Sequence, residues 1–202
     1  MSKRSPNTRD KKLKIIGLTG GIASGKTTIL TEFKKLGIKT ISCDEIAKKI
    51  YKRTSVHKRI KKLFGTSSRK KIAKIIFSDF TKRKQLEKIM HPLIIKELKN
   101  QLKLLSTPYS LLPVVIDVPL LFEAHLEKMF DKIIVVYCKK NQQTSRLMKR
   151  DKLTKSEAIK RIASQIRMSE KIKHSDFILR NDALVRGKKI NSQIKKILDK
   201  II

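Results

Sequence analysis

The spacing of apolar and polar residues divides most of the chain into alternating strands and helices. Continuous apolar runs, typical of buried parallel strands, occupy Leu13–Thr19, Val114–Ile116 and Lys132–Tyr137. Shorter apolar runs at Lys39–Ser42 and Asp176–Leu179 predict two further strands. Because strands that alternate with helices form doubly wound sheets, we expect an α/β fold with a parallel sheet flanked by helices.

Apolar residues at helical spacing predict the elements between these strands. The predicted helices are Thr28–Leu36, one that opens at Asp44, Gln142–Arg150, one from the capping box Thr154–Glu157 to about Ser169, and Leu184–Ile201.

Between about residues 54 and 106 the pattern is helical and contains no strand. We expect breaks near Gly65–Ser68 and at Pro92, and a loop at Thr107–Pro113. This stretch is predicted to be a helical cap inserted into a single domain that spans residues 13–202. Residues 1–12 are polar and basic, without the apolar segment of a signal peptide, and are predicted to be a tail.

Composition indicates a soluble globular protein, since 40% of the 202 residues are hydrophobic and 33% are charged. No apolar run reaches the length of a membrane span, so we expect no membrane association. Cys43 and Cys138 lie in different predicted elements and indicate neither a disulfide framework nor a metal site. A reducing cytoplasm is therefore the expected location. No pattern in the chain indicates the oligomeric state.

The net charge of +33, from 50 Lys and Arg against 17 Asp and Glu, would ordinarily favour a nucleic-acid partner. The lysines, however, are spread over nearly every predicted helix, only 5% of residues are aromatic, and there is no Trp for base stacking. We expect no specific nucleic-acid partner, but weak, salt-sensitive binding to polyanions. Such a surface would also attract an anionic small-molecule substrate.

One segment, Gly20–Thr27, has the sequence GGIASGKT and matches the phosphate-binding pattern G-x-x-x-x-G-K-[ST]. It lies between a predicted strand and a predicted helix, which favours a phosphate loop over a plain Gly-rich turn. Backbone N–H groups at a helix N-terminus bind phosphates, Lys26 can reach the outer phosphates, and the Thr27 hydroxyl can ligate Mg²⁺. We therefore expect ATP and Mg²⁺ as cofactors. The expected nucleotide-binding residues are Gly21, Ile22, Ala23, Ser24, Gly25, Lys26, Thr27 and Thr28.

Seven motifs occur in order from about Ile15 to the last helix. They are Gly17–Thr27, Asp44–Ala47, Leu86–Ile94, Asp117–Glu123, Arg146–Asp151, Arg161–Gln165 and Asp176–Asn181. Together they resemble the dephospho-coenzyme A kinase family. The resemblance implies a P-loop kinase with a parallel sheet, a helical acceptor-binding cap, and a helical lid at about residues 144–168. It also implies ATP-dependent phosphorylation of the ribose 3′-hydroxyl of dephospho-coenzyme A, the small-molecule substrate, to give coenzyme A and ADP. This is the last step of coenzyme A biosynthesis.

The chain departs from the family pattern at four places. Ala23 stands where the family usually has glycine, and Ser42 replaces an aspartate common two residues before Asp44. The segment Phe64–Arg69 is shorter than the family's loop, and Ala183 replaces a usual glycine. None of these changes removes a group to which we assign chemistry.

Two aspartates follow predicted strands. From spacing alone, Asp44 is a helix N-cap or an acceptor ligand. The resemblance implies that Asp44, with Lys26 and Arg150 as the other expected catalytic residues, binds the acceptor and orients or deprotonates its hydroxyl. Asp117 resembles a carboxylate on the metal side, and with Thr27 is the expected metal site. Its alternative role is to cap the next helix.

The remaining candidates lie in the other motifs. Pro119, Leu120 and Phe122 look like a wall against the acceptor. His91 precedes Pro92, which should keep its backbone out of helix, and we interpret it as an acceptor contact or a helix end rather than a base.

Arg146 and Arg150 lie four residues apart and should share one face of a helix. With Arg161 they look like lid residues that close over the phosphates; a solvated basic face is the alternative. Asn181 is a candidate for adenine contact or for capping a turn. The alternative functions are another P-loop nucleotide or nucleoside kinase and, less favoured, a basic nucleic-acid-binding ATPase.

Overall fold

The structure is a computed structural model that describes residues 13–105, 112–182 and 188–202. Four parts of the predicted organisation lie outside these residues: the tail 1–12, residues 107–111 of the predicted loop, Ala183, and residues 184–187 of the predicted last helix.

The chain divides into two compact units. The first comprises Met1–Ile41 and Thr107–Ile202, and the second comprises Ser42–Ser106. The cap predicted at about residues 54–106 falls in the second unit, which also contains helix α2 (Cys43–Tyr51).

A five-stranded sheet lies at the centre of the first unit, with the strand order β2-β3-β1-β4-β5. The strands are β1 (Ile15–Gly20), β2 (Lys39–Ser42), β3 (Val114–Asp117), β4 (Lys132–Tyr137) and β5 (Phe177–Arg180). β1 pairs in parallel with β3 and β4, and β4 pairs in parallel with β5. The predicted α/β fold is thus confirmed, because the β-branched runs form buried parallel strands.

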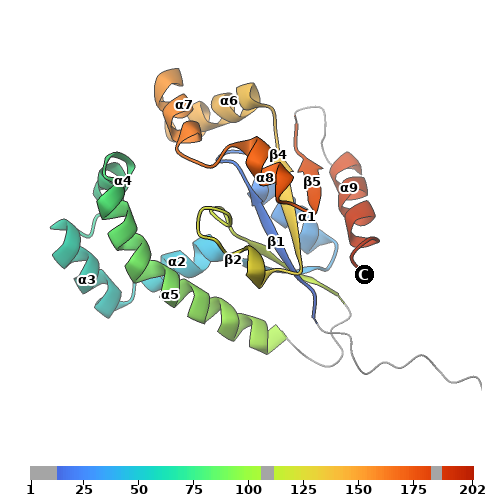
Figure 1. The fold of residues 1–202 in the computed structure, drawn as a ribbon, viewed down its shortest axis with the longest axis horizontal. Coiled ribbons are helices and arrows are strands. Elements are labelled where there is room, and N and C mark those ends of the chain that lie inside the picture. Colours follow the sequence, from blue (N-terminus) through green and yellow to red (C-terminus); the bar gives the residue numbers. More distant parts are fainter. Residues whose placement is uncertain (1–12, 106–111, 183–187) are drawn as a thin grey trace, which may run out of the picture. The chain divides into compact units, whose positions relative to one another are not determined.

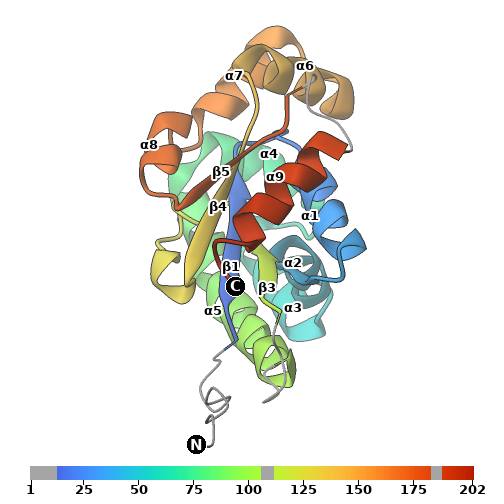
Figure 2. The same cartoon turned by 90° about the vertical axis from the view of Figure 1, so that its right-hand side faces the viewer.

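The first unit also contains helices. They are α1 (Lys26–Lys35), the short η1 (Glu127–Met129), α6 (Lys140–Asp151), α7 (Lys155–Ala163), α8 (Met168–Lys173) and α9 (Lys188–Leu198). Figure 2 shows α1 and α9 on one face of the sheet. Their apolar side chains, among them Phe33 and Ile194, form a fully buried core with Leu18 and Ile134 of the strands.

The opposite face of β1 is covered by the segment 118–130. A Cβ added at Gly17 would lie 2.7 Å from Leu121 Cδ1 and 2.9 Å from Phe130 Cγ. Only glycine therefore allows this segment to pack so closely on β1. Because this segment begins directly after Asp117, its packing on β1 fixes the path of the chain beyond the end of β3.

Among the described residues of the second unit, all regular structure after Ser42, the last residue of β2, is helical (Figure 1). It contains α2, α3 (Thr54–Phe64), α4 (Arg69–Ser78) and α5 (Phe80–Leu105). The predicted break near Gly65–Ser68 is confirmed. Gly65 ends α3 in the left-handed conformation, with φ of 66°, and the Ser68 side chain caps α4.

The predicted break at Pro92 is wrong, because α5 runs through this proline as a helix of 26 residues. Pro92 has no N–H and forgoes one helical hydrogen bond. α5 packs against α2 and α4, and this packing outweighs the tendency of proline to end a helix.

The predicted helix from Thr154 to about Ser169 has the expected capping box but ends early, at Ala163. The Ile166 N–H donates to Glu123 Oε1 at 3.2 Å. In a continuing helix this N–H would bond to the carbonyl four residues earlier. A tertiary contact thus replaces the next helical bond, and α8 begins separately at Met168.

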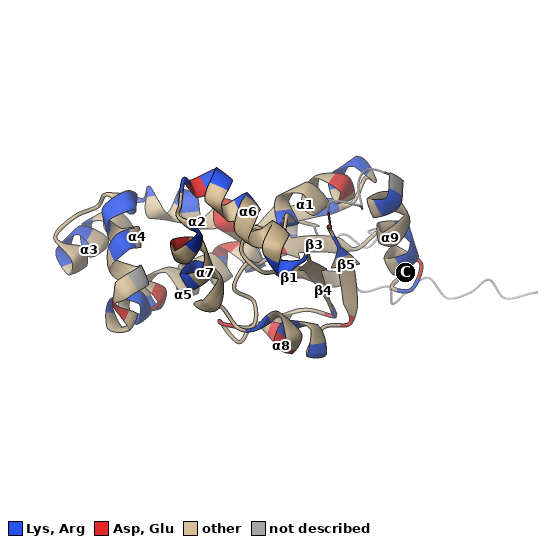
Figure 3. Cartoon of the chain, turned by 90° about the horizontal axis from the view of Figure 1, so that it is seen from above, with Lys and Arg blue, Asp and Glu red and all other residues tan. Residues whose placement is uncertain are grey.

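Lysine and arginine occur on nearly every helix of both units and do not gather into one stripe (Figure 3). Across the described residues, the structure contains no helix with the length and apolarity needed to cross a membrane.

Candidate active site

The backbone between β1 and α1 forms a tight loop. Gly20 has φ of 150° and Gly25 has φ of 90°, and the Ser24 N–H donates to the Gly21 carbonyl at 3.1 Å. A Cβ at Gly25 would collide with the Asn181 side chain, so this position needs glycine for both its conformation and its space. The loop leads directly into the first turn of α1, where unpaired N–H groups can meet phosphate oxygens.

Ala23 also adopts the left-handed conformation, with φ of 57°. This is the position at which the family usually has glycine. The Cβ is accommodated at a cost of about 1–2 kcal/mol, the usual penalty for a non-glycine residue in this region. The departure from the family pattern therefore stores modest strain in the loop.

The Lys26 side chain bends back over the loop. Its Nζ donates to the Gly20 carbonyl at 3.1 Å and to the Gly21 carbonyl at 3.4 Å. Thr27 and Thr28 are exposed in the first turn of α1. The ammonium group and two hydroxyls thus lie at the same helix N-terminus, where negative charge is stabilised.

Two side chains from distant elements hold the second half of the loop. Asn181, buried at the end of β5, donates from Nδ2 to the Ser24 carbonyl at 2.9 Å. Arg146 on α6 donates to the same carbonyl at 3.3 Å and to the Asn181 carbonyl at 3.0 Å. Asn181 was predicted as an adenine contact and Arg146 as a lid residue. In this structure both contact the backbone of the phosphate loop.

The other two lid arginines are joined through one carboxylate. Asp151 accepts hydrogen bonds from Arg150 Nε at 2.8 Å and from Arg161 Nη1 at 2.9 Å. The bond with Arg150 lowers the pKa of Asp151, and it raises the pKa of Arg150. Arg150 is 57% exposed, so this cluster lies at the surface of α6 and α7. Arg146, one turn earlier on α6, has different partners, the carbonyls of Ser24 and Asn181.

Asp117 ends β3 and is 6% exposed. Its Cα pairs in register with Leu18, two residues before the phosphate loop begins. The alternative that it caps a following helix is wrong, because turns occupy 119–125 and the next element, η1, starts after Leu126. The hydroxyl of Thr27 and the carboxylate of Asp117 are the hard oxygen donors that Mg²⁺ prefers.

The expected acceptor wall lies in these turns. Phe122 is buried, whereas Pro119 and Leu120 are half-buried. The Thr19 hydroxyl donates to the Pro119 carbonyl at 3.4 Å, which ties the turn to β1.

In the second unit, Asp44 is exposed in the first turn of α2. Its predicted alternative role as the helix N-cap is wrong. Ser42 caps the helix, because its Oγ accepts the Glu45 N–H at 3.4 Å. Ser42 is the residue that replaces the family's aspartate, and a hydroxyl fills the capping position as well as a carboxylate does.

His91 lies in the interior of α5 and is half-buried, so the predicted helix end at this residue is wrong. Burial lowers its pKa, and the nearby Glu87 carboxylate opposes this shift. A neutral imidazole is therefore favoured, which fits a contact rather than a charged group.

Two groups near the loop were not predicted as site residues. Gln143 bonds the Ile22 carbonyl and Gln165 bonds the Ile22 N–H, and Glu123 forms a buried ion pair with Lys171. Gln165 and Glu123 fall within motifs that resemble the family, which was a usable signal. No sequence signal marked Gln143 or Lys171, because a polar or charged residue on a basic helix is expected to face solvent.

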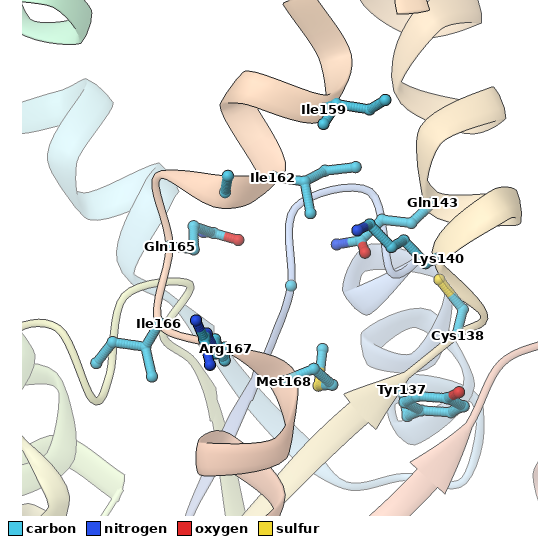
Figure 4. A pocket seen from close by; sticks show the side chains of 12 residues that line it. Tyr137, Cys138, Lys140, Gln143, Ile159, Ile162, Gln165, Ile166, Arg167 and Met168 are labelled. Atoms are coloured by element: carbon cyan, nitrogen blue, oxygen red, sulfur yellow. The ribbon is translucent and has the colours of Figure 1, made fainter. Parts of the chain in front are cut away.

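A cavity of about 450 Å³ lies beside Gly21 (Figure 4). Its polar side chains include Lys140, Gln143, Gln165 and Arg167, and isoleucines of α7 form its apolar part. The hollow adjoins the phosphate loop and is lined from β4, α6, α7 and the turn that follows α7.

Comparison with known proteins agrees with this arrangement. The family model described as dephospho-CoA kinase matches residues 14–186. A Bacillus cereus protein named dephospho-CoA kinase is 39% identical over 189 residues, which cover 89% of this chain and 94% of that protein.

Two solved structures are similar over nearly their whole length. The dephospho-CoA kinase from Campylobacter jejuni is 31% identical with a TM-score of 0.65, and the match covers 93% of this chain and 96% of that one. A Thermus thermophilus protein is 28% identical with a TM-score of 0.80, covering 95% and 100%. By the extent of the family match and the identity to its members, the chain belongs to the dephospho-CoA kinase family.

Proposed function

We propose that the chain transfers the γ-phosphoryl group of ATP to the ribose 3′-hydroxyl of dephospho-coenzyme A, giving coenzyme A and ADP. The observation that carries this proposal is the phosphate loop between β1 and α1, with Lys26 over it, in a chain of this family. The bond from the γ-phosphorus to the bridging oxygen of ADP breaks, a bond to the acceptor oxygen forms, and the hydroxyl proton leaves.

On the donor side, the loop amides and Lys26 bind the triphosphate. Phosphoryl transfer needs positioning and neutralisation of charge more than covalent help from the protein. The contacts of Arg146 and Asn181 to the Ser24 carbonyl keep the loop in its tight conformation before nucleotide arrives. Asn181 is also the proposed contact to adenine.

For the metal, Thr27 and Asp117 supply the protein ligands. Among the described residues no group of three or more His, Cys, Asp or Glu side chains could hold an ion. The pair of Thr27 and Asp117 fits Mg²⁺, which takes one or two protein oxygens and completes its shell with phosphates and water. Bound Mg²⁺ would neutralise charge on the outer phosphates.

On the acceptor side, Asp44 orients the 3′-hydroxyl and accepts its proton. With the N-cap role taken by Ser42, the charge of Asp44 is left for this task. Pro119, Leu120 and Phe122 contact the acceptor, and so does His91. Arg150 stabilises the charge that develops during transfer, and Arg146 and Arg161 bind substrate phosphates as the lid closes.

An acceptor screen tests the proposal. ADP release is measured with purified protein, ATP and Mg²⁺, with dephospho-coenzyme A or with nucleosides, nucleoside monophosphates or single-stranded RNA as the second component. We expect turnover with dephospho-coenzyme A alone. A preference for a nucleoside or nucleotide would favour the general P-loop kinase alternative, and stimulation by RNA without acceptor would favour a nucleic-acid-dependent ATPase.

The partner proposed is thus a small molecule, and the basic surface gives only weak, salt-sensitive polyanion binding. With two cysteines in different elements, the chain fits activity in the reducing cytoplasm.

A further inference from the structure

The backbone N–H and the carbonyl of Ile22, in the middle of the phosphate loop, are each bound by a glutamine side chain. Gln165 Oε1 accepts the Ile22 N–H at 2.7 Å, and Gln143 Nε2 donates to the Ile22 carbonyl at 2.6 Å. The backbone fixes both amide orientations, because an N–H requires an oxygen and a carbonyl requires an N–H. The two peptide groups on either side of the Ile22 Cα are therefore each held by one glutamine side chain.

The two glutamines come from different helical segments. Gln143 lies on α6 and is 6% exposed, and Gln165 lies in the turn between α7 and α8. Figure 4 shows their side chains pointing toward one another beside the cavity. The hold on Ile22 therefore depends on the positions of α6 and of the turn after α7 at once.

The turn that carries Gln165 is itself anchored. Glu123 Oε1 accepts the Ile166 N–H at 3.2 Å and the Lys171 ammonium at 2.7 Å. Lys171 is fully buried, so the ion pair is shielded from solvent. Thus Gln165 bonds to the phosphate loop, and the next residue, Ile166, bonds to the segment that follows Asp117.

We infer that Gln143 and Gln165 are positioning residues that fix the phosphate loop in its nucleotide-binding conformation and link it to the lid helices. The inference rests on the proposed function for its effect on turnover, but its effect on nucleotide binding does not depend on the acceptor. Without the two bonds, the Ile22 backbone becomes free to leave the tight turn. Binding of ATP must then order it again, at a cost in conformational entropy.

Binding of a non-hydrolysable ATP analogue, measured by calorimetry without acceptor, tests this role. Gln143→Leu and Gln165→Leu should each weaken binding about 5–30-fold, the equivalent of fixing one residue's backbone. The double variant should be little weaker than either single one, because one remaining bond does not fix both the φ and the ψ of Ile22. Thermal unfolding of each variant reports whether it is folded.

An isosteric pair separates this role from a simple effect of charge. Gln165→Glu keeps an oxygen for the Ile22 N–H, whereas Gln143→Glu loses the donor to the Ile22 carbonyl. Both add one negative charge beside the Ile22 backbone. We expect Gln143→Glu to weaken binding about 10-fold more than Gln165→Glu, the value of one hydrogen bond at the upper end of the usual range.

Gln142→Glu adds the same charge one position along α6 and serves as the control. Equal losses in the two isosteric variants would overturn the inference. So would a lower melting temperature with unchanged binding, which marks a merely structural role. Tighter binding by Gln165→Leu would also overturn it, because it would mean that Gln165 competes with the nucleotide. If analogue binding follows the expected pattern but dephospho-coenzyme A is not phosphorylated, the proposed function fails and this inference stands.

Discussion

Two junctions between a strand and a helix present different chemistry in this chain. Between β1 and α1 the chain forms a loop with three residues at positive φ, and side chains from α6 and β5 hold its backbone. Between β2 and α2 there is no loop: Ser42 ends the strand and caps the helix. The first junction offers backbone N–H groups, and the second offers an exposed carboxylate, Asp44, on a rigid turn.

This difference shows how one fold places phosphate binding and proton transfer at separate strand–helix junctions. A phosphate chain needs many converging donors, so its loop must be strained and supported from outside. A base needs one carboxylate, and a capped helix turn positions it without outside support. Removing a side chain that binds phosphate or supports the loop at the first junction should therefore affect nucleotide affinity as well as rate, whereas removing the carboxylate at the second should affect the rate alone.

The largest effect is expected at the second junction. Asp44→Asn keeps the size of the side chain and removes its charge. We expect kcat to fall about 10²–10⁴-fold, the usual contribution of a general base, with KM for ATP unchanged. Steady-state kinetics with dephospho-coenzyme A measure both. Glu45→Gln, at the next residue of the same exposed turn, is the matched control. Retained kcat in Asp44→Asn would return this residue to a structural role.

Lys26→Ala should lower kcat about 10²–10³-fold, the cost of removing one group that stabilises charge in the transition state. KM for ATP should also rise, because the ammonium binds phosphates in the ground state. The control is Lys35→Ala on the same helix, whose ammonium is exposed and pairs with Glu32 at 2.8 Å. Near-normal activity in a folded Lys26→Ala protein would refute the assignment of the phosphate loop.

Arg146 and Arg150 sharpen the comparison within one helix. Arg146→Ala removes two charged hydrogen bonds to carbonyls around the loop, so KM for ATP should rise about 10–100-fold. Arg150→Ala should lower kcat by a similar factor and leave KM for ATP nearly unchanged, because its partner is Asp151 rather than the loop. The same kinetic change in both variants would contradict the distinction.

The smallest effect concerns the strain at Ala23. Ala23→Gly relieves about 1–2 kcal/mol at positive φ but adds about 0.5–1 kcal/mol of entropy to the unfolded chain. We expect unfolding in denaturant to show a net gain in stability of about 0–1.5 kcal/mol, with unchanged KM for ATP. Ala158→Gly, in the buried interior of α7, should instead destabilise the protein. A loss of stability in Ala23→Gly would mean that the loop is not strained.

The elements that local chemistry decides could be predicted from the sequence. β-Branched runs marked β3 and β4, and the spacing of Gly20, Gly25, Lys26 and Thr27 marked the phosphate loop. These signals depend on residues that are neighbours in the chain. The strand order and the faces covered by α1 and α9 depend on contacts between distant residues, so no local pattern encodes them.

Other predictions failed where tertiary contacts overrode local preference. Pro92 was expected to end a helix, but α5 continues through it. α7 was expected to continue past Ala163, but Glu123 takes the next helical N–H. Arg146 and Arg150 have the same spacing signal, and only the position of the Ser24 carbonyl separates their partners. No pattern along the chain contains that information.

Identification of the product tests the central claim most directly. The protein is incubated with ATP, Mg²⁺ and dephospho-coenzyme A, and the product is examined by mass spectrometry and by ³¹P–¹H correlated NMR. The account predicts the addition of one phosphate, coupled to the proton on the ribose 3′ carbon, and its absence with Lys26→Ala. Phosphate on any other hydroxyl, or ADP formed without a phosphorylated acceptor, would contradict the account.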